Sequence, residues 1–139
     1  MKKFILLITL LIPISSFSLN DPASFKSFNN PTFRIFIVAN ANYKTGATDL
    51  KYTTNDATLY KALFQKVLGV KNSHIQINKN LTVDSFDKAF KKFKKTIKKD
   101  ELVVIIYSGH GQKNGMPQMV DGKSISVENY NSYFKSFFT

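Results

Sequence analysis

Cysteine is absent from the 139 residues, and histidine occurs only as His74 and His110. The first absence excludes disulfide bonds and a thiol nucleophile within these residues. With two histidines and no cysteine, a zinc site is not expected, and no cofactor is expected either. Acidic residues are also few, because 9 Asp and Glu face 20 Lys and Arg, for a net charge of +11. This surplus favours an anionic surface as a partner, without specific nucleic-acid recognition, although solubility is its simplest explanation.

Long apolar runs are lacking as well. The longest, residues 4–14, contains Pro13 and is shorter than the roughly 20 residues that span a bilayer. Lys2 and Lys3 precede it and small residues follow it, which is the pattern of a signal peptide. We expect cleavage near Ser18, export to the periplasm or the extracellular space, and a mature charge of 11 − 2 = +9. An uncleaved membrane anchor is the alternative interpretation.

The rest of the chain alternates between strand and helix patterns. Residues 33–39 and 102–107 are short apolar runs typical of buried strands, and a third strand is predicted at residues 74–77. Helical spacing follows Asn55 and Thr82, which we expect to cap the two helices. The residues expected on their buried faces are Tyr60, Leu63, Phe64, Val67 and Leu68, and then Val83, Phe86, Phe90, Phe93 and Ile97. This order predicts a mostly parallel sheet with helices on both faces, a three-layer α/β/α sandwich.

Three further segments complete the predicted organisation. Residues 19–32 have no periodicity and are predicted to be a linker, and residues 40–54 a polar loop. A short hairpin is expected at residues 117–123. Helical spacing follows it at Val127, Tyr130, Phe134 and Phe137.

The segment Ser108-Gly109-His110-Gly111 follows directly on the last predicted strand. Parallel sheets place their functional sites beyond the carboxyl ends of the strands, and glycines permit a tight turn that presents one imidazole there. A histidine without catalytic duty is the alternative for such a residue taken alone. A phosphate-binding Gly-x-Gly loop fits poorly, because no third glycine falls at the required spacing.

Three segments, taken in order, resemble the caspase and metacaspase family of cysteine endopeptidases. They are residues 33–42, a strand with an Asn-rich turn, residues 50–57 with Asn55-Asp56-Ala57, and the Ser-Gly-His-Gly motif. The resemblance covers roughly residues 33–125. It implies a caspase-like sandwich over residues 33–139, incomplete at its C-terminal side, and proteolysis after basic residues.

The resemblance also implies roles for single residues. His110 would be the general base for a cysteine, and the Gly111 amide would be one oxyanion donor. Asp56 and Ser108, with Thr53 nearby, would bind the basic side chain of a substrate. Structural roles stay open for two of them, since Asp56 also suits the first turn of a helix and Ser108 is a small residue leaving a strand.

The chain departs from the family in its nucleophile. Caspase spacing puts the catalytic cysteine about 50 residues after the histidine, which from His110 lies beyond Thr139. We therefore expect a truncated domain that is inactive alone. Without further strands, residues 102–107 would form an exposed hydrophobic edge that attracts a partner chain.

A non-enzymatic binding module is the rival hypothesis. In it a pseudopeptidase would bind an anionic surface through lysines clustered on the second predicted helix. These lysines are Lys88, Lys91, Lys92, Lys94, Lys95, Lys98 and Lys99. Phe90 and Phe93 lie among these lysines at the spacing of a buried helix face. A solvated lysine face over a packed stripe is therefore the simpler interpretation.

Overall fold

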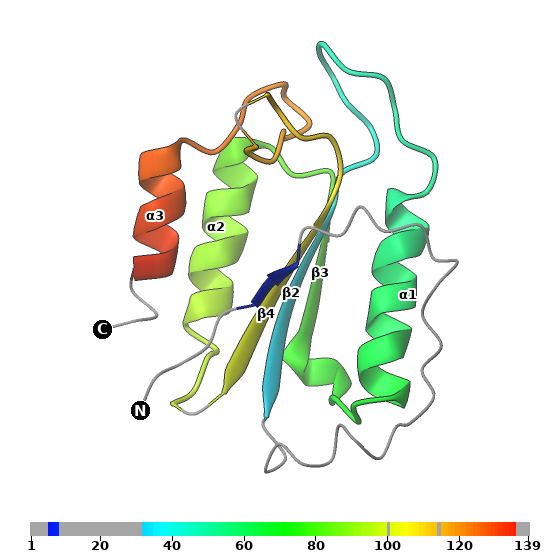
Figure 1. Cartoon of the computed structure of the whole chain (residues 1–139), viewed down its shortest axis with the longest axis vertical. Coiled ribbons are helices and arrows are strands. Elements are labelled where there is room, and N and C mark those ends of the chain that lie inside the picture. The colour runs from blue at the N-terminus through cyan, green and yellow to red at the C-terminus, as the bar shows by residue number, and fades with distance from the viewer. Residues whose placement is uncertain (1–5, 9–31, 100, 114, 136–139) are drawn as a thin grey trace.

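The computed structural model describes residues 6–8, 32–99, 101–113 and 115–135. Its sheet has four parallel strands in the order β1-β4-β2-β3: β1 (Leu6–Ile8), β2 (Phe33–Ala39), β3 (Ile75–Lys79) and β4 (Leu102–Ser108). Helix α1 (Thr53–Lys66) covers one face, and α2 (Val83–Lys94) and α3 (Val127–Lys135) cover the other (Figure 1). The predicted three-layer α/β/α architecture is confirmed.

The central strands are buried on both faces, which explains their unbroken apolar sequences. In β2, Ile35 and Ile37 pack on the α1 side, whereas Phe36 packs against α2. In β4, Val104 packs on the α1 side and Ile105 on the α2 side. Alternate residues of one strand thus enter two separate cores.

Helix α2 follows its sequence prediction closely. Thr82 is the N-cap, and its hydroxyl accepts from the Ser85 amide in a capping box. Phe86, Phe90 and Phe93 are buried against the sheet. The lysines of this segment lie on the opposite side, with those at 88, 91, 92, 95, 98 and 99 exposed. The interpretation of a solvated lysine face over a packed stripe therefore describes this helix.

Helix α1 differs from its prediction in both its start and its buried face. It begins at Thr53 after Tyr52, so Asn55 lies inside the helix and is not its cap. Ala57 and Phe64 are buried against the sheet, and Tyr60 and Leu68 are partly buried against the same core. Leu63 and Val67, by contrast, are 40% and 43% exposed. Helical periodicity therefore identified the helix and three residues of its buried face, and was wrong for Leu63 and Val67.

Strand β3 also begins later than predicted. His74 closes a short 3-10 helix, Asn72–His74, and the strand starts at Ile75, opposite Ile35 of β2. The imidazole Nδ1 of His74 lies 3.2 Å from the Phe33 carbonyl oxygen, so this ring is tied to the start of β2. The predicted C-terminal helix is present as α3, while Phe137 lies outside the described residues.

The outer edge of β4 carries a short strand from the N-terminal segment. Leu6, Leu7 and Ile8 of β1 lie opposite residues 104–106 in parallel register. The expected hydrophobic edge is therefore covered over three residues in the described structure, by part of the predicted signal peptide. Of the predicted signal peptide and linker, only β1 and residue 32 are among the described residues. None of the described helices is long and apolar enough to cross a membrane.

A buried ion pair joins the starts of β2 and β4. The guanidinium of Arg34 donates to both carboxylate oxygens of Glu101, at 3.0 Å and 2.7 Å. Burial alone would raise the pKa of Glu101, but hydrogen bonds from Arg34 and from the Lys98 amide hold it below its ordinary value. A pair with both carboxylate oxygens bound fixes the register of the central strands at the end opposite the histidine.

Candidate active site

The candidate site lies where β2, β3 and β4 end. The Asn40 amide donates to the Ser108 carbonyl at 2.9 Å, which continues the pairing of β2 with β4. The Asn40 side-chain oxygen accepts from the Leu81 amide at 2.8 Å, and the Asn80 side-chain oxygen accepts from the amides of Ala41 and Asn42. These bonds bring the loop after β2 into a defined position beside the end of β4.

The last two residues of β4 face opposite sides of the sheet, as alternation requires. Tyr107 contacts the core on the α2 side. Ser108 turns to the α1 side, where its hydroxyl donates to the Asp56 carboxylate at 2.8 Å. The structure thus brings together Asp56 and Ser108, which lie 52 residues apart in sequence.

Thr53 lies in the same first turn of α1 as Asp56. Its side chain is buried, and its hydroxyl oxygen has no hydrogen-bond partner within the described part of the chain. A buried hydroxyl that lacks a partner is energetically unfavourable. The three residues named from the sequence for a basic side chain thus comprise one hydrogen-bonded pair and one buried hydroxyl.

The imidazole of His110 is oriented by the loop after β2. Its Nε2 lies 2.8 Å from the Thr48 carbonyl oxygen. A carbonyl can only accept, so Nε2 carries the proton and Nδ1 of the neutral ring carries the lone pair. The Tyr43 ring meets the imidazole edge-on, with the ring centroids 4.7 Å apart.

The Gly111 amide points away from the turn that follows it. Gly111 and Pro117 form an antiparallel bridge. Its two hydrogen bonds run through neighbouring residues, from the Gln112 amide to Met116 and from the Gln118 amide to the His110 carbonyl. In this pattern the bridged residues direct their own polar groups outward. The Gly111 amide is therefore turned away from Pro117, on the outer side of this bridge.

Sequence reasoning missed the residues that hold the histidine. These are Thr48, Tyr43 and Tyr107; the two tyrosine hydroxyls hydrogen-bond to the His110 backbone. Only Tyr107 had a usable signal, because it directly precedes the Ser-Gly-His-Gly motif. Thr48 acts through its backbone carbonyl, and because every residue has one, the residue type at this position gives no signal.

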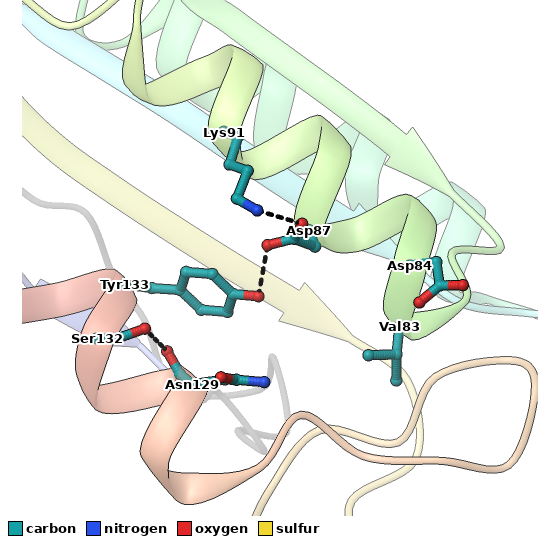
Figure 2. Close-up of a pocket in the computed structure, with 7 residues that line it drawn as sticks. All are labelled: Val83, Asp84, Asp87, Lys91, Asn129, Ser132 and Tyr133. Carbon is teal, nitrogen blue, oxygen red and sulfur yellow. Dashed lines mark hydrogen bonds and ion pairs between the residues drawn. The ribbon is translucent and has the colours of Figure 1, made fainter.

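The described residues contain no cluster of three or more His, Cys, Asp or Glu that could hold a metal ion. They do form an open pocket of about 370 Å³ between α2 and α3, lined by Val83, Asp84, Asp87, Lys91, Asn129, Ser132 and Tyr133 (Figure 2). There Lys91 and the Tyr133 hydroxyl both donate to Asp87. Burial, with Asp87 as acceptor, raises the pKa of Tyr133 to about 12. Because neither His110 nor its partners line this pocket, we treat it as separate from the candidate site.

A model of the caspase domain family matches residues 33–138, more than half of the chain. The chain belongs to the caspase-domain family. The match runs from the first residue of β2 through the histidine motif, so it includes every element of the candidate site. A search of curated proteins found no match. The caspase-like peptidase fold is thus established, while the roles of single residues rest on the geometry above.

Proposed function

We propose that this chain carries the histidine half of a caspase-like cysteine endopeptidase site. The thiol would come from a segment that these 139 residues do not contain, since they include no cysteine. The observation that carries the proposal is the hydrogen bond from His110 Nε2 to the Thr48 carbonyl. It leaves Nδ1 as a base at the carboxyl end of a buried parallel strand, the position from which a general base serves a nucleophile.

The reaction follows from this arrangement. Nδ1 of His110 takes the proton of the thiol, and the thiolate sulfur attacks the carbonyl carbon of the substrate peptide. The carbonyl oxygen becomes an oxyanion, which accepts from the outward Gly111 amide and from the amide of the nucleophile itself. The imidazolium then returns its proton to the leaving amine, and water hydrolyses the thioester to release the acid and restore the thiol.

The pair of Asp56 and Ser108 supports specificity for a basic side chain. The Ser108 hydroxyl fixes the Asp56 carboxylate, and a fixed carboxylate is the natural acceptor for a guanidinium or an ammonium group. Thr53 lies in the same turn with a buried hydroxyl, and we propose that it supports the carboxylate side of this pocket from beneath. We therefore propose cleavage after Arg or Lys, by an exported protein whose leader is removed near Ser18.

The test has two stages. The DNA directly downstream is sequenced first, to find a segment with a cysteine in another frame or in a neighbouring gene. The protein made by joining that segment to this chain, here called the joined product, is then assayed on matched peptides with Arg, Lys or Asp before the scissile bond. The 139-residue chain and a His110→Ala version of the joined product are assayed beside it. We expect only the joined product with His110 to cleave, and only the Arg and Lys peptides to be cleaved. Equal rates for the joined product and its His110→Ala version would refute the role of the histidine.

The exposed lysines of α2 favour a second function. Six of them lie on the solvent side of the helix and its C-terminal extension, which suits binding to an anionic surface without catalysis. The full chain would be tested on vesicles with and without anionic lipid over a range of salt concentrations. Charge-driven binding must weaken as salt rises and when Lys92, Lys95 and Lys99 are replaced by Gln. Binding that is indifferent to salt would exclude this function.

A further inference from the structure

A tyrosine hydroxyl lies within hydrogen-bond distance of each backbone polar group of His110. The His110 amide donates to the Tyr43 hydroxyl oxygen at 2.8 Å. The Tyr107 hydroxyl lies 2.9 Å from the His110 carbonyl oxygen, and the Gln118 carbonyl is a second acceptor within its reach. The two hydroxyl oxygens lie 3.3 Å apart. Side chains from the loop after β2 and from the end of β4 therefore meet at one residue.

The direction of these hydrogen bonds follows from the available protons. An amide can only donate, so the Tyr43 oxygen accepts from His110 and its own proton is free to be donated onward. The Tyr107 oxygen, at 3.3 Å, is nearer to it than the Gln118 carbonyl, at 3.5 Å. Tyr107 in turn donates to a carbonyl, that of His110 or that of Gln118, with which it forms a very short contact. When it donates to His110, the bonds form a closed circuit that begins and ends on the His110 backbone.

Tyr107 is suited to donate throughout this circuit. Burial, followed by the neighbouring Tyr43 hydroxyl, raises the pKa of Tyr107 far above its ordinary value. The hydroxyl therefore keeps its proton at neutral pH. Hydrogen bonds linked in one direction strengthen one another in a site of low dielectric constant.

Gly109 provides the space for the two hydroxyls. A Cβ atom at this position would lie 2.7 Å from the Tyr43 hydroxyl oxygen and 2.7 Å from Cζ of Tyr107, and would also clash with the Tyr107 hydroxyl. A Cβ atom at Gly111 would meet nothing within 4 Å. The first glycine of the motif is thus required by the hydroxyl pair, and the second is not.

We propose that Tyr43 and Tyr107 are positioning residues for His110. Their hydroxyls fix the His110 backbone, and the Thr48 carbonyl fixes the ring. The lone pair on Nδ1 therefore points in one direction even when no substrate is bound. The purpose of this device rests on the proposed function, whereas its evidence is the hydrogen-bond geometry alone. It predicts that the loss of either hydroxyl loosens the histidine while the fold remains.

The test uses the full chain with Tyr43→Phe and Tyr107→Phe. Both variants keep the aromatic ring and lose only the hydroxyl. Tyr133→Phe is the matched control, because it loses a hydroxyl bonded to Asp87 in the separate pocket between α2 and α3. Hydrogen exchange of the His110 amide and the 15N spectrum of its imidazole are measured by NMR.

We expect the His110 amide of Tyr43→Phe to exchange roughly fivefold faster than in the unmodified chain, the effect of losing one ordinary hydrogen bond. Tyr107→Phe should also accelerate it, and in both variants the ring should sample both tautomers. Tyr133→Phe should leave these signals unchanged. If the exchange rate of the His110 amide were unchanged in Tyr43→Phe, the proposal would be overturned. It would also be overturned if amide exchange accelerated equally at His110 and throughout β2 and β4, because that result would indicate a general loosening of the sheet.

The two proposals fail separately. These spectra need no catalysis, so a joined product that does not cleave peptides would refute the proposed function and leave the exchange result standing. Active cleavage together with an unchanged His110 amide in Tyr43→Phe would refute the positioning role alone.

Discussion

Replacing Gly109 with Ala tests the packing around the histidine most sharply. The new methyl group must displace the hydroxyls of Tyr43 and Tyr107, because neither tyrosine leaves room for it. Overpacking of this kind costs about 1–3 kcal/mol, and each hydrogen bond lost with a hydroxyl adds about 1 kcal/mol. Substituting Ala for Gly recovers about 0.4–1 kcal/mol through the unfolded chain.

The net effect of Gly109→Ala is a destabilisation of about 1–4 kcal/mol, estimated from these terms. A domain of this size has a free energy of unfolding of roughly 5–15 kcal/mol, so the variant should still fold. Gly111→Ala is the matched control, since a methyl group there enters open space. It should be neutral or slightly stabilising. Urea unfolding of the full chain, followed by circular dichroism, measures both variants.

A double-mutant cycle assigns the effect to the hydroxyl. The nearest obstacle to the new methyl group is the Tyr107 hydroxyl, so Gly109→Ala should cost less in a Tyr107→Phe background. We expect a coupling free energy of at least about 0.5 kcal/mol, the range typical of residues in contact. If Gly109→Ala destabilised the chain no more than Gly111→Ala, the packing argument would be wrong.

Three further predictions concern the ion pair, the substrate pocket and the sheet edge. Glu101→Gln should lower the free energy of unfolding by about 3–5 kcal/mol, because it leaves Arg34 buried without its counter-charge. The folded pKa of Glu101 is lowered. Its contribution to the free energy of unfolding is therefore complete above its unfolded pKa of about 4.3 and is lost as pH falls through the folded pKa. Acid unfolding of the unmodified chain and of Glu101→Gln would show this difference. Asp56→Asn in the joined product should reduce cleavage of Arg peptides at least tenfold, estimated from one charge-assisted contact. If peptides with an uncharged residue before the scissile bond lost cleavage to the same degree, the role of Asp56 in binding a basic side chain would be refuted. Removal of residues 1–18 takes away β1 and uncovers the edge of β4, so sedimentation should show self-association of residues 19–139, and a stable monomer would contradict the account.

The sequence predicted the elements whose burial is complete. Residues 33–39 and 102–107 are buried on both faces, so their strands appear as unbroken apolar runs and their bounds were right to within one residue. Helix α2 was equally clear, since Thr82 caps it and three phenylalanines line its buried side. These signals are local, and tertiary contacts do not override them.

The elements that depend on distant partners were predicted less well. Leu63 and Val67 have helical spacing but lie exposed, because α1 packs on the sheet through Ala57, Tyr60, Phe64 and Leu68. The buried pair of Arg34 and Glu101 joins residues 67 positions apart, and nothing in their local sequence pairs them. The histidine motif was visible in the sequence, whereas its support by Thr48 is a backbone contact across 62 positions.

The most direct test of the central claim is the protonation of the His110 ring in the full chain. A 15N NMR spectrum of the neutral imidazole, assigned with a His74→Gln variant, reports which nitrogen carries the proton. We predict a single tautomer with the proton on Nε2, bonded to the Thr48 carbonyl, and with nuclear Overhauser contacts between the ring and that residue. A proton on Nδ1, or a freely exchanging mixture of tautomers, would contradict a histidine held ready for a thiol.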